Sequence, residues 1–344
     1  MFRGKPAKYP EIYKQLLAYI SDSSPEPGYR LPGERVFAEK FKCSHLTVRK
    51  SFRILEQENR IHTIPGIGRF TGAAPERKSI FPAGEGVAGF IFPDDEIYYY
   101  KLFAALEKTL SALNLHPVVH LTGMNAAKED AILDFLEKLP AAALIAVPNL
   151  QCASHYRKLT IPTVFFDIHP ENSTTPYVVS DDYGGAEQAV KYLLALGHRK
   201  IAFIGGMEEP SSIARRDGYS DTLLAAGVPV ERKFIKLLEP SRQWGFRAMK
   251  ELLGEKMRPT AVFCSNDTIA AGVARAVMSA GLQLKKDVEI VGFGNTVIAE
   301  DLNICSVSQH SDKIAWALKE ALGRMLTGKP PVPSVTIPTE LIKR

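Results

Sequence analysis

Short apolar runs alternate with helical stretches over most of the chain, and this alternation restricts the fold more than any other feature. Ten runs are predicted as strands: Val87–Phe92, Pro117–Leu121, Ala143–Val147, Thr163–Asp167, Val178–Ser180, Lys200–Ile204, Phe234–Leu238, Ala261–Cys264, Glu289–Gly292 and Cys305–Ser308. Helices are predicted between most of them, at about 98–114, 126–139, 183–196, 212–226, 242–253, 267–280 and 311–326. Such a pattern predicts parallel sheets with helices on both faces.

Ten strands are many for one open sheet in a chain of 344 residues. Two lobes of this α/β type fit the pattern better, with a crossover near residues 165–185. Gly184, which follows Asp181 and Asp182, begins the helix that leads into the second lobe. Two such lobes leave a cleft between the carboxyl ends of their strands, where ligands of open α/β sheets bind.

The first seventy residues follow a different pattern, a helix, a short turn and a second helix. The first helix is predicted at Glu34–Phe41, and the second begins at about Ser44, a good N-cap residue. Val48, Phe52 and Leu55 recur at helical spacing and mark a core face.

The opposite face of the second helix carries Thr47, Arg49, Lys50 and Arg53. Hydroxyl and cationic side chains there match what DNA phosphates and base edges require. Two β-prone runs around a Pro/Gly tip follow at Ile61–Phe70 and predict a hairpin, or wing.

Charge is distributed unevenly between these two parts of the chain. Residues 1–80 hold 15 Lys and Arg against 8 Asp and Glu, whereas the remainder holds 28 against 30. The basic excess therefore lies in the part predicted to contact nucleic acid, as expected for a DNA-binding module.

Residues 8–72 resemble the winged helix-turn-helix of GntR-type bacterial transcription regulators. The matching motifs are Leu-Pro-x-Glu-Arg at Leu31–Arg35, Ser-x-x-Thr-Val-Arg-Lys at Ser44–Lys50 and the Gly-x-Gly wing at Gly66–Gly68. The resemblance implies binding to double-stranded DNA, and the candidate DNA-binding residues are Arg35, Ser44, His45, Thr47, Arg49, Lys50, Gly66 and Gly68.

Residues 87–343 resemble the effector domain of LacI/GalR-type repressors, which is similar to periplasmic sugar-binding proteins. The motifs that carry the resemblance are Ser180–Ala186, Leu196–Gly206, Arg215–Tyr219, Ser265–Asp267 and Val291–Gly294. A GntR-type reader joined to this sensor is similar to arabinose-repressor-type regulators, which implies a small effector, most simply a sugar.

Four polar residues lie at or after predicted strand ends or at a helix start, where cleft ligands bind: Asp167, Arg215, Asn266 and Asn295. Carboxylate, amide and guanidinium groups pair with sugar hydroxyls. Structural alternatives remain open: Asp167 could cap a loop, Arg215 could pair with a helix carboxylate, and Asn266 could cap the next helix. By resemblance, the first three match ligand-binding positions.

An aromatic contact with a sugar is expected from Tyr98, Tyr99 or Tyr100, at the start of the first sensor helix. Successive helical residues point about 100° apart, so at most two of the three rings face the cleft. Tyr98 is taken as the candidate.

An enzyme would need features that the sequence does not supply. The Gly-x-Gly-x-x-Gly run at Gly84–Gly89 precedes a strand, so it lacks the context of a dinucleotide site. The eight histidines show no metal-ligand spacing, so no metal or cofactor is expected. Four scattered cysteines, no signal peptide and no long apolar run favour a cytoplasmic protein.

Together these features predict a winged helix-turn-helix at residues 1–72, a linker at 73–85 and a two-lobed periplasmic-binding-protein-like α/β domain at 86–344. The expected function is ligand-modulated repression of transcription by a homodimer on a palindromic operator. A sugar-binding transport component and an enzyme on a doubly wound fold are the alternatives.

Overall fold

The chain forms two compact units, which are described here one at a time. A computed structural model describes residues 9–23, 28–64, 68–73, 86–139, 141–207, 210–238, 240–327, 329 and 333–344. The first unit contains residues 1–83 with the short segments 137–140 and 153–160, and the second contains the rest. Of the predicted linker, only residue 73 is among those described.

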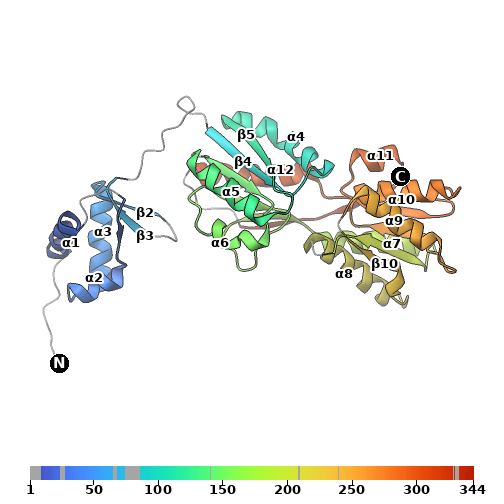
Figure 1. The fold of residues 1–344 in the computed structure, drawn as a ribbon, viewed down its shortest axis with the longest axis horizontal. Coiled ribbons are helices and arrows are strands. Elements are labelled where there is room, and N and C mark those ends of the chain that lie inside the picture. The colour runs from blue at the N-terminus through green and yellow to red at the C-terminus, as the bar shows by residue number, and fades with distance from the viewer. Residues whose placement is uncertain are drawn as a thin grey trace. The chain divides into compact units, whose positions relative to one another are not determined.

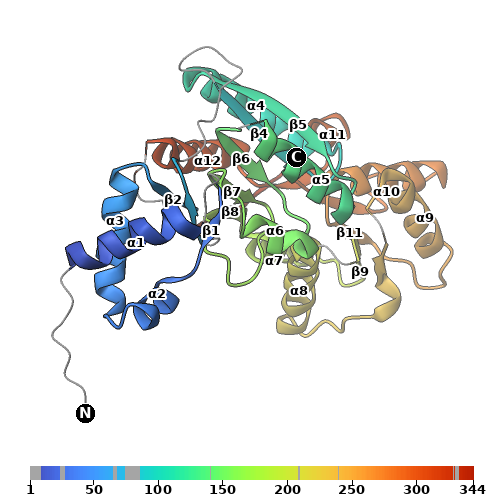
Figure 2. The ribbon, with the colours of Figure 1, turned by 60° about the vertical axis from the view of Figure 1, so that its left-hand side comes forward.

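The N-terminal part combines helices with a small antiparallel sheet in the order β1-β3-β2. Its elements are α1 (Tyr9–Ser23), β1 (Arg30–Leu31), α2 (Glu34–Lys40), α3 (His45–Gln57), β2 (Ile61–Ile64) and β3 (Gly68–Thr71). Figure 2 shows α1 crossing α3, with the hairpin beside them. The helix-turn-helix and wing predicted from the sequence are therefore present, and α1 was not predicted.

The face of α3 that was predicted to be buried does form the core of this unit. Val48, Phe52 and Leu55 are fully buried against Phe37 of α2 and Ile12 of α1. The Ser44 side chain caps α3 by accepting a hydrogen bond from the Thr47 backbone N–H at 3.2 Å. Burying one face of α3 leaves its opposite face for solvent.

The first lobe of the second unit is a parallel sheet in the order β14-β8-β7-β6-β4-β5. Its strands are β4 (Gly86–Phe92), β5 (Leu115–Leu121), β6 (Ala143–Ala146), β7 (Thr163–Phe166), β8 (Tyr177–Ser180) and β14 (Val335–Ile337). Its helices are α4 (Ile97–Ala112), α5 (Ala126–Lys138) and α12 (Ser311–Leu326), with a 3₁₀ turn at Leu150–Cys152. The last two residues of α5 and the short α6 (Ala153–Tyr156) belong to the segments grouped with the first unit. α4 and α12 share one hydrophobic core with the sheet (Figure 1).

The second lobe is a sheet in the order β10-β9-β11-β12-β13-β15, in which only the β13–β15 pair is antiparallel. Its strands are β9 (Ile201–Gly205), β10 (Ile235–Leu237), β11 (Ala261–Cys264), β12 (Glu289–Phe293), β13 (Cys305–Ser308) and β15 (Glu340–Ile342). Its helices are α7 (Asp182–Ala195), α8 (Pro210–Ala225), α9 (Arg242–Leu253), α10 (Asp267–Ser279) and α11 (Val297–Asp301), with a 3₁₀ turn at Arg232–Phe234.

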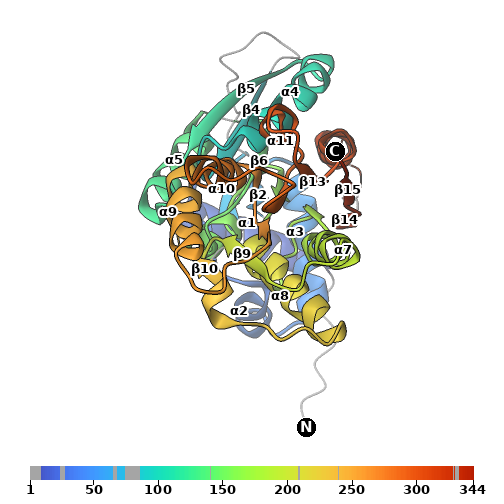
Figure 3. The same cartoon turned by 90° about the vertical axis from the view of Figure 1, so that its right-hand side faces the viewer.

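Alternation along the buried strands explains how helices cover both faces of this second sheet. In β9, Ala202 and Ile204 face the core that contains α9 and α10. Ile201 and Phe203 face the opposite core, which contains α7 and α8. Because successive strand residues point to opposite faces, an apolar run needs an apolar layer on each side. Figure 3 shows the two helix pairs on the two sides of the sheet.

The chain crosses between the lobes three times, at residues 180–182, 308–311 and 337–340. The first crossing lies in the predicted range, and the other two were not predicted. α12 and β14 return to the first lobe, and β15 ends in the second. The crossings are joined by hydrogen bonds from Gln309 Nε2 to Ser180 Oγ at 2.9 Å and from Thr339 Oγ1 to the Asp181 carbonyl at 3.1 Å.

Within the part of the chain that the structure describes, no helix has both the length and the apolar content needed to span a membrane.

Candidate functional site

The N-terminal unit presents a polar surface around the start of α3. Arg35, Ser44, His45, Arg49 and Lys50 are exposed there, and Thr47 is half-buried. Lys50 Nζ lies 4.1 Å from the centre of the Tyr9 ring of α1. The DNA-binding residues predicted in α2 and α3 therefore lie in the same unit, and most of them are exposed.

The wing is described only in part. Gly68 begins β3 with a φ of 145°, a conformation that favours glycine. Gly66, at the predicted tip, lies outside the described residues.

An acidic residue, Glu34, organises the cations of this surface. Its carboxylate pairs with Arg49 Nη2 at 2.9 Å and with Arg69 Nη2 at 2.9 Å. Partial burial disfavours the charged form of Glu34, but hydrogen bonds and charges from Arg49 and Arg69 outweigh it and lower its pKa. One carboxylate therefore holds α2, α3 and the hairpin together and sets the direction of two guanidinium groups.

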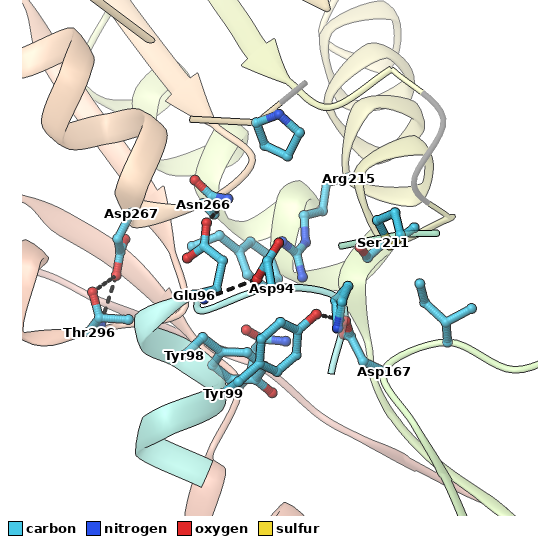
Figure 4. Close-up of a pocket in the computed structure, with 16 residues that line it drawn as sticks. Asp94, Glu96, Tyr98, Tyr99, Asp167, Ser211, Arg215, Asn266, Asp267 and Thr296 are labelled. Atoms are coloured by element: carbon cyan, nitrogen blue, oxygen red, sulfur yellow. Dashed lines mark hydrogen bonds between the residues drawn. The ribbon is translucent and has the colours of Figure 1, made fainter. Parts of the chain in front are cut away.

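The second unit contains a cleft between its two lobes (Figure 4). The first lobe contributes Asp94, Glu96, Tyr98, Tyr99 and Asp167, among others. The second lobe contributes further lining residues, including Ser211, Arg215, Asn266, Asp267, Phe293 and Thr296. Most of them follow a strand end or begin a helix, because the carboxyl ends of parallel strands meet at one edge of a sheet.

Arg215 is buried in the cleft and already has partners in the protein. Its Nε and Nη2 donate to Asp182 Oδ1 at 2.9 and 2.7 Å, and its Nη1 donates to the Ser265 carbonyl at 2.6 Å. The guanidinium also lies 3.7 Å from the centre of the Phe293 ring. A guanidinium carries five N–H groups, so two remain for a ligand after these three bonds.

Glu96 links the two lobes across the cleft. It precedes α4 in the first lobe, and its two carboxylate oxygens accept hydrogen bonds from Asn266 Nδ2 and Thr268 Oγ1 of the second lobe, each at 3.0 Å. Asn266 also caps α10, with its Oδ1 accepting from the Ile269 backbone N–H at 2.8 Å. The capping role that the sequence left open for Asn266 is therefore real, and its amide faces the cleft as well.

Asp167 and Asp94 supply further carboxylates on the first-lobe side. The Tyr99 hydroxyl donates to Asp167 Oδ2 at 3.1 Å (Figure 4). Burial raises the pKa of Asp167, against the opposing influence of Arg215 and the Tyr99 hydrogen bond. Burial also raises the pKa of Asp94. Both groups thus place carboxyl oxygens in the cleft, and burial disfavours their charged forms.

Two of the three consecutive tyrosines line the cleft, in agreement with the prediction from their helical spacing. Tyr98 and Tyr99 are buried and line the cleft, whereas Tyr100 is 59% exposed. The Tyr98 hydroxyl lies near Ser180 but forms no hydrogen bond of normal geometry within the described residues.

The structure does not bring Asn295 to the cleft. Its Oδ1 accepts a hydrogen bond from Arg344 Nη2 at 2.6 Å, and its backbone carbonyl accepts one from Lys101 Nζ at 2.7 Å. The chain ends close to this loop, a contact between distant segments that strand spacing does not reveal. Phe293 and Thr296, on either side of Asn295, line the cleft instead.

Comparison with known protein families separates the chain into the same two kinds of domain. Residues 8–70 match bacterial regulatory proteins of the gntR family, and residues 190–344 match the periplasmic binding protein-like domain. The chain joins a gntR-family domain to a periplasmic binding protein-like domain.

Curated proteins similar to this chain include transcription repressors. The probable transcriptional repressor ExuR of Bacillus subtilis is 35% identical over 140 residues, which cover 40% of this chain and 42% of that protein. The arabinose metabolism transcriptional repressor of Geobacillus stearothermophilus is 25% identical over 315 residues, 85% of this chain and 83% of that protein. The chain thus spans less than half of the first relative and most of the second.

Solved structures share the fold of the periplasmic binding protein-like part. The regulator CcpA of Lactococcus lactis superposes with a TM-score of 0.68 at 20% identity, over 76% of this chain and 98% of that chain. A periplasmic binding protein/LacI regulator from Alkaliphilus metalliredigens superposes with a TM-score of 0.67 at 24% identity, over 76% and 98%.

Sequence reasoning missed two residues that organise the sites of this protein. Glu34 was recognised only as part of a motif, and Glu96 was not singled out. The available signal for Glu96 was its place just beyond the first sensor strand, where cleft residues gather.

Proposed function

We propose that this protein is a transcription repressor whose affinity for its operator changes when a small hydroxyl-rich molecule, most simply a sugar, binds in the cleft. The supporting observation is the presence in one chain of a basic winged helix-turn-helix and an interlobe cleft lined by Asp94, Asp167 and Arg215. Neither feature alone would suggest both roles.

Sugar as the effector is supported by the relatives. One of them is named for arabinose metabolism, and one solved neighbour is complexed with D-xylulofuranose. The cleft offers carboxylates and a guanidinium for hydroxyl groups and the ring of Tyr99 for an apolar sugar face.

DNA contact is assigned to the exposed side of α3 and to α2. Thr47, Arg49 and Lys50 would contact phosphates and base edges in the major groove, with Arg35 beside them and the Gly66–Gly68 tip in the minor groove. A homodimer, formed through the second unit, would place two winged helix-turn-helix domains on a palindromic operator. We further propose that the protein acts in the cytoplasm and catalyses no reaction.

Ligand binding in the cleft would change how the lobes close on each other through the three crossings between them. DNA and ligand then affect each other's affinity by the same factor, since the coupling free energy is reciprocal.

Selection of binding sites from a random duplex library tests the proposal. The full chain is expected to enrich one sequence with twofold symmetry, whose half-sites are spaced by one helical turn or a multiple of it. Failure to enrich any sequence would contradict the role in DNA recognition.

Glu34→Ala is expected to reduce the discrimination between the enriched operator and a scrambled duplex. The substitution releases Arg49 from its ion pair, so that its guanidinium can contact any phosphate. Arg69 loses one of its two carboxylate partners and keeps Glu56. The ratio of the two affinities, measured by fluorescence anisotropy at one salt concentration, should fall several-fold. Glu39→Ala removes the same charge from an exposed position of α2 and serves as the control; an unchanged ratio in Glu34→Ala would contradict the positioning role.

A further inference from the structure

The exposed face of α3 carries an apolar side chain next to its cations. Leu46 lies in the first turn of α3 and is 61% exposed. Arg49, Lys50 and Arg53 follow it at spacings of three, four and seven residues, and all three are exposed. Residues at these spacings share one face of a helix. Leu46 is therefore the apolar end of a stripe of positive charge.

The direction of this stripe is set by the packing of the opposite face of α3. Val48, Phe52 and Leu55 are fully buried in the core of the N-terminal unit. Successive helical residues are about 100° apart, so Leu46 points about 180° away from Leu55. The core thus places Leu46 at the middle of the exposed face.

Local contacts hold the helix on both sides of Leu46. The Ser44 and Thr47 hydroxyls form a hydrogen bond with each other at 2.9 Å, and Ser44 Oγ also accepts one from the Thr47 backbone N–H at 3.2 Å. In the next turn, Glu34 pairs with Arg49 at 2.9 Å. Leu46 is thus presented on a fixed turn, which lowers the entropy cost of placing it against a partner.

Double-stranded DNA is the partner that this face suits. A stripe of cations matches a polyanion, and the recognition helix of a helix-turn-helix places its N-terminal residues against base edges in the major groove. The leucine side chain has no hydrogen-bond donor or acceptor with which to bind the polar groups of the bases. The apolar group that base edges present in the major groove is the C5-methyl of thymine.

We propose that Leu46 contacts the C5-methyl group of a thymine in each operator half-site and makes the protein prefer thymine there. This inference rests on the proposed DNA-binding function and names one base that it reads. Arg49 and Lys50 attract the DNA, whereas Leu46 discriminates against bases that lack a methyl group in the major groove.

Removal of the methyl group from the DNA tests this contact. In the operator selected by the wild-type full chain, each thymine of the half-site is replaced in turn by deoxyuridine, in both half-sites at once. Deoxyuridine keeps the hydrogen-bonding groups of thymine and lacks the methyl. We expect at least one position at which the replacement weakens binding by about fourfold per half-site, as loss of one buried methyl group implies. Fluorescence anisotropy at one salt concentration measures the change.

Leu46→Ala tests the same contact from the side of the protein. The variant should bind the thymine and deoxyuridine operators equally at that position, because the side chain that contacts the methyl group is gone. Alanine favours helices, so the fold should persist. Leu224→Ala truncates a leucine that is 60% exposed on α8 of the second unit, and it should keep the wild-type sensitivity to deoxyuridine.

Leu46→Gln adds a readout that a purely structural role of Leu46 would not change. Selection from the random duplex library with this variant should lose the preference for thymine at the same base pair and keep the rest of the sequence, since glutamine favours adenine.

Three outcomes would overturn the inference: no deoxyuridine position that weakens wild-type binding, equal sensitivity in Leu46→Ala, or an unchanged thymine preference in Leu46→Gln. Failure of the wild-type protein to select any operator would instead defeat the proposed regulatory function. The two failures are therefore distinguishable, because a selected operator without a methyl contact leaves that function standing.

Discussion

Arg215→Ala is expected to lose its response to the effector while operator binding persists. The substitution removes the only lining cation among the described residues and leaves the buried Asp182 carboxylate without its partner. Breaking a buried ion pair by removing one partner costs about 3–5 kcal/mol, so the melting temperature of the second unit should also fall. Calorimetric titration with the sugar that stabilises the wild type most should show no binding.

A matched substitution separates these effects from a general loss of charge. Arg216, the next residue of α8, is partly exposed and pairs with its neighbour Asp217. Arg216→Ala removes the same charge and should leave both stability and the effector response close to wild type. The double variant Arg215→Met with Asp182→Asn removes the pair together, and it should recover stability but not sugar binding. An Arg215→Ala protein that still responds fully to the sugar would remove Arg215 from the site.

Arg49→Ala is expected to weaken operator binding by about 5- to 150-fold and to leave sugar affinity unchanged. Loss of a well-placed contact with a base costs about 1–3 kcal/mol, which corresponds to that range. Arg49 is 53% exposed at the side chain and held by Glu34, so its guanidinium is oriented before DNA binds. Fluorescence anisotropy with the selected operator measures the change.

The control for Arg49→Ala is Lys191→Ala, which removes one cation from an exposed position of α7. Its operator affinity should remain within about twofold of wild type, because a charge outside the reader contributes only through long-range attraction that salt screens. Loss of sugar binding in Arg49→Ala, with operator binding intact, would contradict the assignment of the two roles to the two units.

Periodic burial explains why so much of the fold could be predicted from the sequence. Val48, Phe52 and Leu55 recur at helical spacing because one side of α3 packs on α2 and α1. In the second unit, runs such as Ala261–Cys264 are apolar throughout because helices cover both faces of the sheet. Patterns of this kind are local, so spacing alone reveals them.

Features that depend on contacts between distant segments were not predictable in this way. The sequence does not show that α12 and β14 return to the first lobe, because helices of the two lobes have the same amphipathic pattern. Glu96 accepts hydrogen bonds from Asn266 and Thr268, which lie 170 and 172 positions further along the sequence. Asn295 follows a strand, as cleft residues do, yet Arg344 holds its side chain elsewhere.

The measurement that tests the central claim most directly is a titration of the selected operator with the wild-type protein, without and with a saturating concentration of the sugar that binds it. Regulation by the cleft predicts that the operator affinity changes by about 5-fold or more, as typical coupling energies of 1–3 kcal/mol imply. The same factor should appear in the sugar affinity with and without operator DNA, and it should vanish in Arg215→Ala. Equal operator affinities with and without bound sugar would contradict the coupling of the two sites.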